Sequence, residues 1–529
     1  MSLPAGIVSF PLRQWENGHQ NFKVKLTKDA SFNMRPPFGV RAQDANYHAN
    51  TKNFQWLINH AIGRNITLRA LGNGWSFSEV AVCPGGIVDT RELRYFFQPP
   101  ASFVHADYLA TGKAATDLVF SECGMSIMQL HRELESENNW RRSLRASGAS
   151  NGQTIVGATA TGTHGAGMQA GAVHDAIVGM HVITGPDKHV WIERASKPVA
   201  SDAFISWLGA TLVRDDDAFD AAVVSFGSFG FIQGVLLETE PLFLLKKFVI
   251  GPIAYNDALK RAINNWDFSG IEPMLPMPVT GPEHSLYHFE VVVNPHKFSV
   301  GDISQGVYVK VMYKVPYTSA YNKPQDNAAF QYGDELLGIV QTVLDRIGKP
   351  LRQKLIPPMV NKLFPLAYAA SEEVTGTMGE IFNNTKFRGK AASAAMAIDS
   401  KDASRAVEEF VTLNKRTAFA GALALRFVKG TEATLGFTHF KKSCVLEMDG
   451  VESASSRKFF EKMWFRFEEL GIPYTLHWGK INQILTKDRV IRMYGEAAVQ
   501  SWINCRESLL DAPTRAVFTN PFMQQCGLA

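Results

Sequence analysis

The segment LGNGWSF (residues 71–77) has the composition of a loop that could hold an anion. Gly72 and Gly74 carry no Cβ atom, so the backbone N–H groups around them can approach a negatively charged ligand such as a pyrophosphate. The hydroxyl of Ser76 adds one more donor. The spacing is not G-x-G-x-x-G, so it does not indicate a Rossmann dinucleotide site. Taken alone, the segment is better explained as an ordinary turn.

A second run of small residues, TIVGATATGTHGAG, occupies residues 154–167. Glycine and alanine at alternate places let a flat or extended ligand lie along the backbone. Close packing of a strand against a neighbouring helix would explain the same composition. The run therefore favours a ligand-lined wall only when it is considered together with the loop at 71–77.

Two charged residues interrupt apolar runs that are typical of strands. Arg426 lies in ALALRF (422–427), and a charge inside such a strand must be paired or functional. Glu290 lies in FEVVV (289–293). An outward-facing position on an alternating strand is the favoured interpretation of Glu290, and a carboxylate that faces a site is the alternative.

The elements that must position these residues follow from hydrophobic periodicity. A strand at 66–70 leads directly into the glycine-rich loop, and a helix at 54–62 precedes it. Gly-rich segments and short strands continue to about residue 245, after which the chain is richer in proline, aromatic residues and long helices. The further predicted helices are 125–136, 334–347 and 402–413, and the further predicted strands are 174–184, 189–192 and 234–242.

Composition sets limits on the class of protein. A chain of 529 residues is too long for one compact core, so two or three domains are expected. The formal charge of +4 and the lack of a basic run interleaved with aromatics argue against nucleic acid as a partner. We expect no secretory signal and no membrane span. The five cysteines have no C-x-x-C spacing, so no metal site is expected, and thiols in a reducing compartment favour a cytoplasmic location.

Five motifs in one order carry a resemblance to a known family. They are RALGNGWSF (69–77), TIVGATATGTHGAG (154–167), SFGSFGFI (225–232), LHWGK (476–480) and FTNPF (518–522). Their order resembles the vanillyl-alcohol-oxidase (PCMH-type) FAD-binding flavoproteins, and within them the aldonolactone and alditol oxidase branch. The resemblance covers about residues 30–245 and 415–529. The amino-terminal stretch and large cap are also loosely similar to bacterial type II cholesterol oxidases.

The resemblance implies an α+β fold with a two-lobe FAD-binding domain, one lobe with a five-stranded sheet and one with a smaller sheet. The change in composition near residue 245 sets the boundary, so that domain is expected at residues 1–245 and an α+β substrate-binding cap with an antiparallel sheet at 246–475. The segment 476–529 is expected to return to the FAD domain.

The resemblance also assigns residues to the cofactor. The loop residues would bind the pyrophosphate, a second set would line the flavin and ribityl chain, and Ile232 would pack near the adenine. Branch members commonly carry a histidine, bonded covalently to the flavin, where this chain has Trp75, so FAD is expected to be non-covalent. The pyrophosphate set is Gly72, Asn73, Gly74, Trp75 and Ser76, and the flavin set is Ser147, Gly157, Thr161, Thr163, His164 and Gly165.

Three residues are expected to take part in catalysis. Lys480, in HWGK, would stabilise negative charge that develops on the flavin ring. Arg426 matches the arginine of a branch Glu-x-Arg pair, whose glutamate position is Ala424 here. His439, followed by Phe440, resembles a branch His-Phe pair and could accept the proton of an alcohol, although a histidine satisfied within the core fits the same pattern.

The resulting expectation is an FAD-dependent oxidoreductase that removes a hydride from a CH–OH group, with oxygen as acceptor. The lost carboxylate and the Phe- and Met-rich cap favour a bulky, fairly apolar alcohol as the small-molecule substrate. One alternative is an enzyme of specialised metabolism in which hydride removal triggers ring closure or desaturation. Another is a flavoprotein that has lost turnover and serves as a binding partner.

Overall fold

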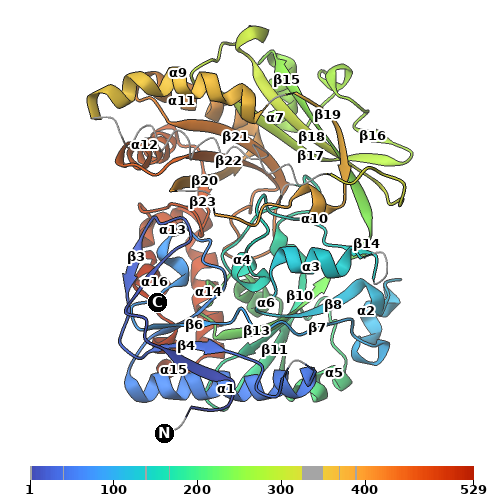
Figure 1. The fold of residues 1–529 in the computed structure, drawn as a ribbon, viewed down its shortest axis with the longest axis vertical. Coiled ribbons are helices and arrows are strands. Elements are labelled where there is room, and N and C mark those ends of the chain that lie inside the picture. The colour runs from blue at the N-terminus through green and yellow to red at the C-terminus, as the bar shows by residue number, and fades with distance from the viewer. Residues whose placement is uncertain are drawn as a thin grey trace.

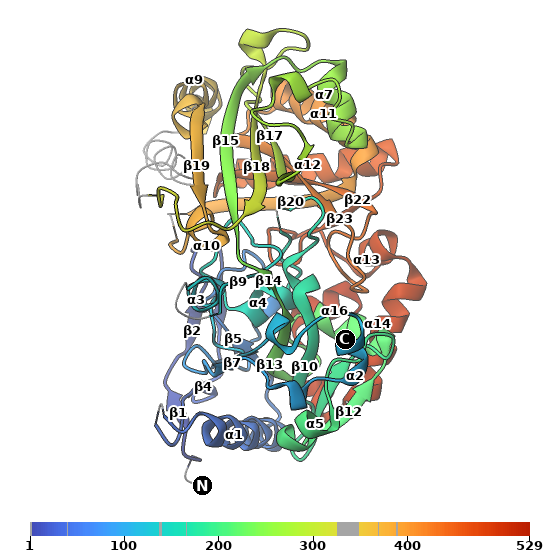
Figure 2. The same ribbon diagram turned by 90° about the vertical axis from the view of Figure 1, so that its right-hand side faces the viewer.

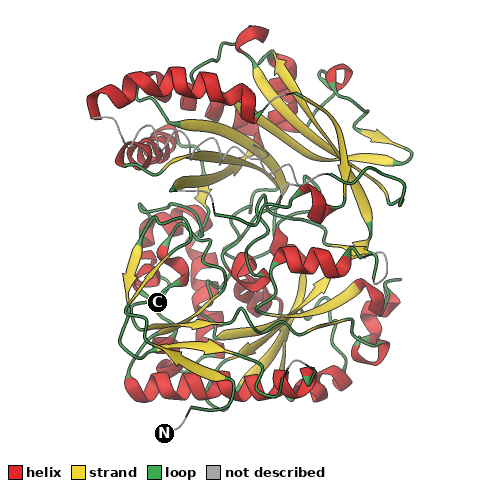
Figure 3. Ribbon diagram, in the orientation of Figure 1, coloured by secondary structure: helices red, strands yellow, loops and turns green. Residues whose placement is uncertain are grey.

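The computed structural model describes residues 3–39, 41–136, 140–165, 167–324, 349–368, 370–387 and 390–529. Its elements form two stacked parts (Figure 1). The part that holds the amino terminus and the carboxyl terminus contains two main sheets, and the other part contains one large sheet. This arrangement confirms the predicted α+β fold class, and Figure 3 shows helices around the sheets of both parts.

A four-stranded sheet delivers the glycine-rich loop. Helix α1 (Gln43–Arg64) ends at Asn65, whose left-handed backbone (φ 51°) turns the chain into β5 (Leu68–Leu71). Strand β5 pairs in parallel with β6 (Gly86–Asp89) and stops at Leu71, so the loop begins at the edge of the sheet. The sheet order is β1-β4-β6-β5, with β1 at Ile7–Phe10 and β4 at Ser31–Met34, and a small ribbon joins β2 (Gln14–Glu16) to β3 (Lys23–Lys25).

A six-stranded sheet forms the second lobe, in the order β12-β11-β10-β13-β8-β7. All eight residues of β13 are buried, so this strand lies at the centre of the lobe. The expectation of a five-stranded and a smaller sheet is corrected to six and four strands, because the short β7 adds an edge strand to β8. The strands are β7 (Phe96–Phe97), β8 (Leu118–Glu122), β10 (Ile177–Ile183), β11 (His189–Glu193), β12 (Thr211–Arg214) and β13 (Phe231–Glu238), with β9 (Arg142–Ser143) pairing with β14 (Glu240–Pro241) nearby.

The carboxyl-terminal helices pack onto these lobes. Helix α14 lies along α6, and the indole nitrogen of Trp502 donates to the Val224 carbonyl at 3.2 Å. Helix α15 packs on α1. The helices of this part are α2 (Ala106–Ala110), α3 (Ile127–Leu134), α4 (Ile155–Ala160), α5 (Asp202–Leu208), α6 (Asp216–Val223), α13 (Lys487–Tyr494), α14 (Glu496–Leu509), α15 (Ala512–Val517) and α16 (Pro521–Cys526).

The other part is built on an antiparallel sheet ordered β19-β15-β18-β17-β21-β22-β20-β23, with β16 added to β17. Helices α7 (Asp257–Asn265), α11 (Ala403–Arg416) and α12 (Ala454–Leu470) cover one face, and α9 (Lys349–Ala367) lies on the opposite side (Figure 2). We call this part the cap. Its strands are β15 (Phe243–Ile253), β16 (Thr280–Gly281), β17 (His284–Val293), β18 (Val307–Pro316), β19 (Ser371–Gly376), β20 (Ala391–Asp399), β21 (Gly421–Lys429), β22 (Lys442–Val451) and β23 (Tyr474–Leu476), and a short helix α10 spans Met378–Ile381.

Alternation along the strands separates the two faces of the cap sheet. Val291 and Leu425 join the core beneath the three covering helices, whereas Val292 and Ala424 pack with Phe364 of α9. The second face is only partly covered by apolar groups and is turned toward the cavity described below. Short 3₁₀ helices complete the fold at Glu79–Ala81, Ala101–Phe103, Ala115–Asp117, Val173–Ala176, Glu272–Met274, Ile303–Gln305 and Ser400–Asp402.

The predicted elements agree with the structure where both can be compared. Helices α1, α3 and α11 occur at the predicted places, while the helix predicted at 334–347 lies outside the described residues. The predicted boundary at 245 falls inside β15, because this strand begins at Phe243 and already belongs to the cap sheet. At the other end, β23 finishes at Leu476, and the chain then continues into the carboxyl-terminal helices.

Candidate functional site

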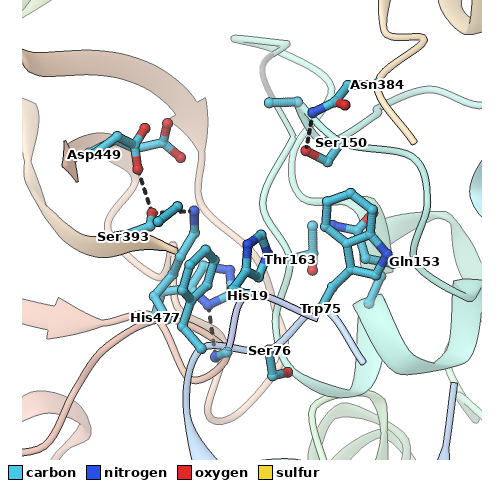
Figure 4. A pocket seen from close by; sticks show the side chains of 18 of the residues that line it. His19, Trp75, Ser76, Ser150, Gln153, Thr163, Asn384, Ser393, Asp449 and His477 are labelled. Carbon is cyan, nitrogen blue, oxygen red and sulfur yellow. Dashed lines mark hydrogen bonds between the residues drawn. The ribbon is translucent and has the colours of Figure 1, made fainter. Parts of the chain in front are cut away.

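A cavity lies between the two parts of the molecule, and Figure 4 looks into it. Trp75 and Thr163 line it from the FAD-domain side expected from the resemblance, and Ser393 and Asp449 line it from the cap sheet. His19, from the amino-terminal segment, sits between these walls in the same view. The cavity therefore draws on segments from the beginning, middle and end of the chain.

The glycine-rich loop forms one wall with open backbone donors. The N–H groups of residues 72–76 donate to no acceptor among the described residues. Gly72 packs on the next wall so closely that a Cβ atom there would lie 2.2 Å from Thr154 Oγ1, and Gly74 has φ +68°, where L side chains are strained. The side-chain amide of Asn73 donates to the Gly152 carbonyl at 2.5 Å and fixes the loop. The geometry is that of a ready anion cradle.

The small-residue run supplies the adjoining wall. Thr154 caps α4 by accepting the N–H of Gly157 at 3.3 Å, and Gly157 is exposed on this short helix. Thr161, which follows the helix, bonds back to the Gly157 carbonyl at 2.9 Å. Thr163 also lines the cavity. A wall of glycine and threonine lets a ligand approach the backbone closely.

Trp75 takes part in an aromatic group at one end of the cavity. Its ring lies 4.4 Å from that of Phe387 and 5.6 Å from that of His19, and His19 stacks on Phe77 at 4.0 Å. His19 is buried, yet neither of its ring nitrogens has a hydrogen-bond partner among the described residues. Burial, helped by the positive charge of Lys480, lowers the pKa of His19 to about 3. A neutral imidazole with two unsatisfied nitrogens is thus available to a ligand.

These observations match the cofactor that the resemblance implies. The open N–H groups of the loop suit a pyrophosphate, the close-packed glycines leave room that a Cβ would fill, and buried polar atoms in the cavity wall lack partners. Besides the two ring nitrogens of His19, Oε1 of Gln153 in this wall lacks a partner among the described residues. The residues present therefore fit FAD.

A row of charged side chains crosses the cavity face of the cap sheet. Glu290 on β17 stands opposite Arg426 on β21, and Arg426 Nε lies 3.3 Å from Glu290 Oε2. The other side of the guanidinium contacts Glu447, with Nη1 to Oε2 at 2.9 Å. The second oxygen of Glu447 bonds to Nε2 of His164 at 3.0 Å, so a hydrogen bond joins the cap to the small-residue wall.

Glu447 was not predicted from the sequence, although it occupies a central place. It lies in VLEMD, where Glu447 and Asp449 are two residues apart and therefore face one side of β22. That i, i+2 pair of carboxylates in an apolar run was the available signal. Burial alone would raise the pKa of Glu447, but Arg426, the bond from His164 and the charge of Lys480 hold that pKa well below its usual range.

A polar chain runs from Lys480 to Asp449. Lys480 Nζ donates to Ser393 Oγ at 2.6 Å, and Ser393 in turn donates to a carboxylate oxygen of Asp449. Burial raises the pKa of Asp449, with Glu447 acting in the same direction and Lys480 opposing it. His477 accepts the Gly479 N–H at Nδ1 (3.0 Å), and burial keeps its pKa well below the usual value, so its Nε2 bears the proton. Of these groups, Asp449 is the one suited to accept a proton.

The structure brings most of the predicted residues to the cavity. The lining includes eleven of them: Gly72, Asn73, Gly74, Trp75, Ser76, Gly157, Thr161, Thr163, His164, Arg426 and Lys480. Glu290 also lines it, so the outward-facing interpretation of Glu290 is wrong: its carboxylate is buried and held by Lys310, Arg426 and His288.

Four predicted residues lie elsewhere. Ser147 is buried and bonds to Asn151 at 2.8 Å, and its neighbours in the chain, residues 148–150, reach the cavity instead. Gly165 packs against Ala146, and Ile232 belongs to the core of the lobe. His439 is exposed and packs beside Phe440 and Tyr494, so it does not reach the cavity as a base.

The described part of the chain contains no group of three or more His, Cys, Asp or Glu side chains that could hold a metal ion. None of the helices described there combines the length and apolar character needed to cross a bilayer.

Comparison with solved structures shows the fold of this chain. The chain is similar to cholesterol oxidase from B. sterolicum with a TM-score of 0.68, 14% identity and coverage of 99% of this chain and 98% of that one. A solvent-stable cholesterol oxidase gives a TM-score of 0.66 at 15% identity, covering 99% of both chains. This chain has the cholesterol oxidase fold. The resemblance to bacterial cholesterol oxidases expected from the sequence is therefore confirmed at the level of the fold.

Sequence relatives confirm the resemblance to the aldonolactone oxidase branch. L-gulono-1,4-lactone dehydrogenase of Mycobacterium tuberculosis is 29% identical over 191 residues, which is 36% of each protein. D-arabinono-1,4-lactone oxidase of Candida glabrata is 24% identical over 185 residues, 35% of this chain and 29% of that protein. The match spans about a third of the length of these curated relatives. No family model matches the chain.

Proposed function

We propose that this protein is an FAD-dependent oxidoreductase that oxidises a CH–OH group of a small molecule. The observation that carries the proposal is the arrangement of the cavity, in which an open anion cradle faces a wall of charged side chains on the cap sheet. The cholesterol oxidases of the same fold and the lactone-oxidising relatives support this class of reaction.

In this proposal the loop at 72–76 holds the pyrophosphate of FAD, and Gly157, Thr161 and Thr163 line the remainder of the cofactor. Bound FAD supplies the hydride acceptor. Trp75 occupies the position of the covalent histidine in the branch, and its indole offers no nucleophilic nitrogen for that bond, so the cofactor is held without a covalent link.

The cap sheet supplies the groups that act on the substrate. Arg426 is held on two sides by Glu290 and Glu447, which fix its guanidinium at the cavity wall for a substrate oxygen. Asp449 takes the hydroxyl proton, in place of the exposed His439, because its pKa is raised and Ser393 orients it. Lys480 adds a positive charge at the same wall, which favours a transition state in which negative charge develops nearby.

The charged side chains of this wall change the expectation of a fairly apolar substrate. Val360 and Phe364 of α9 and the alanines of β21 do provide an apolar surface, but the neighbouring strands present charged groups to the same cavity. We propose an alcohol with an apolar body and polar ends, and oxygen as the acceptor of the electrons.

The decisive test is anaerobic reduction of the purified protein. It should be yellow, and mixing with a panel of primary and secondary alcohols, lactols and sterols should bleach the flavin band with at least one compound. Readmission of oxygen should restore the band if oxygen is the acceptor. A yellow protein that no compound bleaches would refute the proposed reaction and favour a flavoprotein that has lost turnover.

A further inference from the structure

Two lysines stand side by side on the cavity face of the cap sheet. Val249 of β15 is in register with Lys310 of β18, so Lys247, two residues away, is the diagonal neighbour of Lys310 on the same face. Such diagonal neighbours lie roughly 7–8 Å apart at their backbones, within reach of one shared ligand. Both side chains line the cavity and are only partly exposed.

Their negative partner is already engaged. Glu290 contacts Lys310 at 3.2 Å through both oxygens and is also contacted by Arg426 at 3.3 Å and His288 at 3.1 Å. Lys247 makes no ion pair or hydrogen bond through its ammonium group with any residue that the structure describes. Burial, followed by the nearby positive charge of Lys310, lowers the pKa of Lys247 to about 8. At neutral pH the Lys247 ammonium is therefore still charged, and it has no carboxylate of its own among the described residues.

We propose that Lys247 and Lys310 form a binding site for an anionic group of the substrate, a carboxylate, at the end of the cavity away from the Arg426–Glu447 pair. This inference rests on the proposed function, because it extends the same cavity. An ammonium that faces a cavity without a protein partner gains a charge-assisted bond when a carboxylate enters. No residue in the proposed cofactor or proton-transfer set is required for it.

The sheet fixes the length of such a substrate. Lys310, Glu290 and Arg426 lie in one row across three adjacent strands. Strands are spaced about 4.8 Å apart, so the carboxylate would bind roughly 10 Å from Arg426. Val249 and Phe364 line the same cavity, and they favour an apolar chain between the two ends. The substrate class is therefore a hydroxy acid whose hydroxyl and carboxylate are separated by several carbon atoms.

Equilibrium binding of octanoate, which carries the carboxylate without a hydroxyl, tests the site without turnover. Calorimetric titration of the purified holoprotein should show binding that weakens about tenfold or more in Lys247→Gln. Lys247→Arg should retain affinity because it keeps the charge. The matched control is Lys246→Gln, since Lys246 points to the other face of β15 and pairs with Glu373 at 3.1 Å.

The outcomes separate the two proposals. Equal octanoate affinity in the wild type and Lys247→Gln, with both proteins folded by thermal unfolding, would overturn the carboxylate site. Flavin reduction by hydroxyalkanoic acids of increasing chain length, compared with their methyl esters, then tests whether the site serves the reaction. A preference for the esters would also overturn it. Lys247-dependent octanoate binding with no reduction by any alcohol would instead refute the proposed oxidation and leave the anion site standing.

Discussion

Glu447 faces Ala424 directly across the antiparallel ladder between β22 and β21. Ala424 is the position at which the family resemblance leads us to expect the glutamate of a Glu-x-Arg pair. The carboxylate of Glu447, on the adjacent strand, contacts Arg426 at 2.9 Å. The cavity thus has a carboxylate beside the arginine although residue 424 itself is an alanine.

This relationship predicts that the carboxylate beside Arg426 can be supplied from either position 447 or position 424. Glu447→Gln should slow flavin reduction about 100-fold and destabilise the fold by about 3 kcal/mol, since it leaves the buried Arg426 guanidinium with one carboxylate fewer. The double variant Ala424→Glu with Glu447→Ala moves the carboxylate across the ladder and should recover part of the rate. Stopped-flow reduction and urea unfolding measure the two effects. Identical rates for the wild type and Glu447→Gln would remove this residue from the site.

Lys480 is expected to act through its charge. Lys480→Met should slow flavin reduction about 100- to 1000-fold while FAD stays bound, because the positive charge favours the transition state more than the ground state. Lys441→Met, a change on an exposed side chain, serves as the control and should leave the rate unaltered. Single-turnover kinetics with a reducing alcohol measure both, and a Lys480→Met enzyme with normal rates would contradict the assignment.

The raised pKa of Asp449 predicts a pH dependence. An aspartate accepts a proton only when ionised, so the rate of reduction should rise with pH as the medium passes through this raised pKa. Asp449→Asn should be slower at high pH and should lose that rising limb. Rate–pH profiles of the two proteins provide the measurement. A rising limb that persists unchanged in Asp449→Asn would place the base elsewhere.

Non-covalent cofactor binding has a direct readout. Precipitation of the native protein with acid should release all of the flavin into the supernatant, because Trp75 provides no nitrogen for a covalent bond. The flavin content of pellet and supernatant is measured by absorbance. Flavin that stays in the pellet would show a covalent bond, and peptide mapping would then begin with His19, whose ring nitrogens lack partners among the described residues.

Carboxylate binding near Lys247 should depend on pH in the opposite direction to the base. Lys247 is charged below its pKa of about 8 and neutral above it, so octanoate affinity should fall as the pH rises from 7 to 9. The groups that face it are Lys310 on β18 and Glu290 on β17, while β19 presents the uncharged Val374 in register. Lys247→Arg stays charged and should flatten the profile. An equally steep profile in that variant would assign the titration to another group.

Local sequence determined the parts of the site that depend on backbone chemistry. Gly72 and Gly74 predicted the cradle, because close approach and a positive φ require glycine whatever the surroundings. Arg426 was predicted because it is a charged residue within an apolar strand. Lys480 was predicted because it lies in one of the five motifs that carry the family resemblance. These residues reach the cavity as expected.

Only the tertiary structure decided which charges meet. Strand register places Glu447 opposite Ala424 and Glu290 between Lys310 and Arg426, and a shift of one residue would turn each side chain to the other face. His439 is the opposite case. The His-Phe pair in the sequence predicted that this residue lies at the site, but the fold leaves it exposed on the surface. Backbone preferences are local and can be read residue by residue, whereas a charge acquires its role from partners on strands that the chain reaches much later.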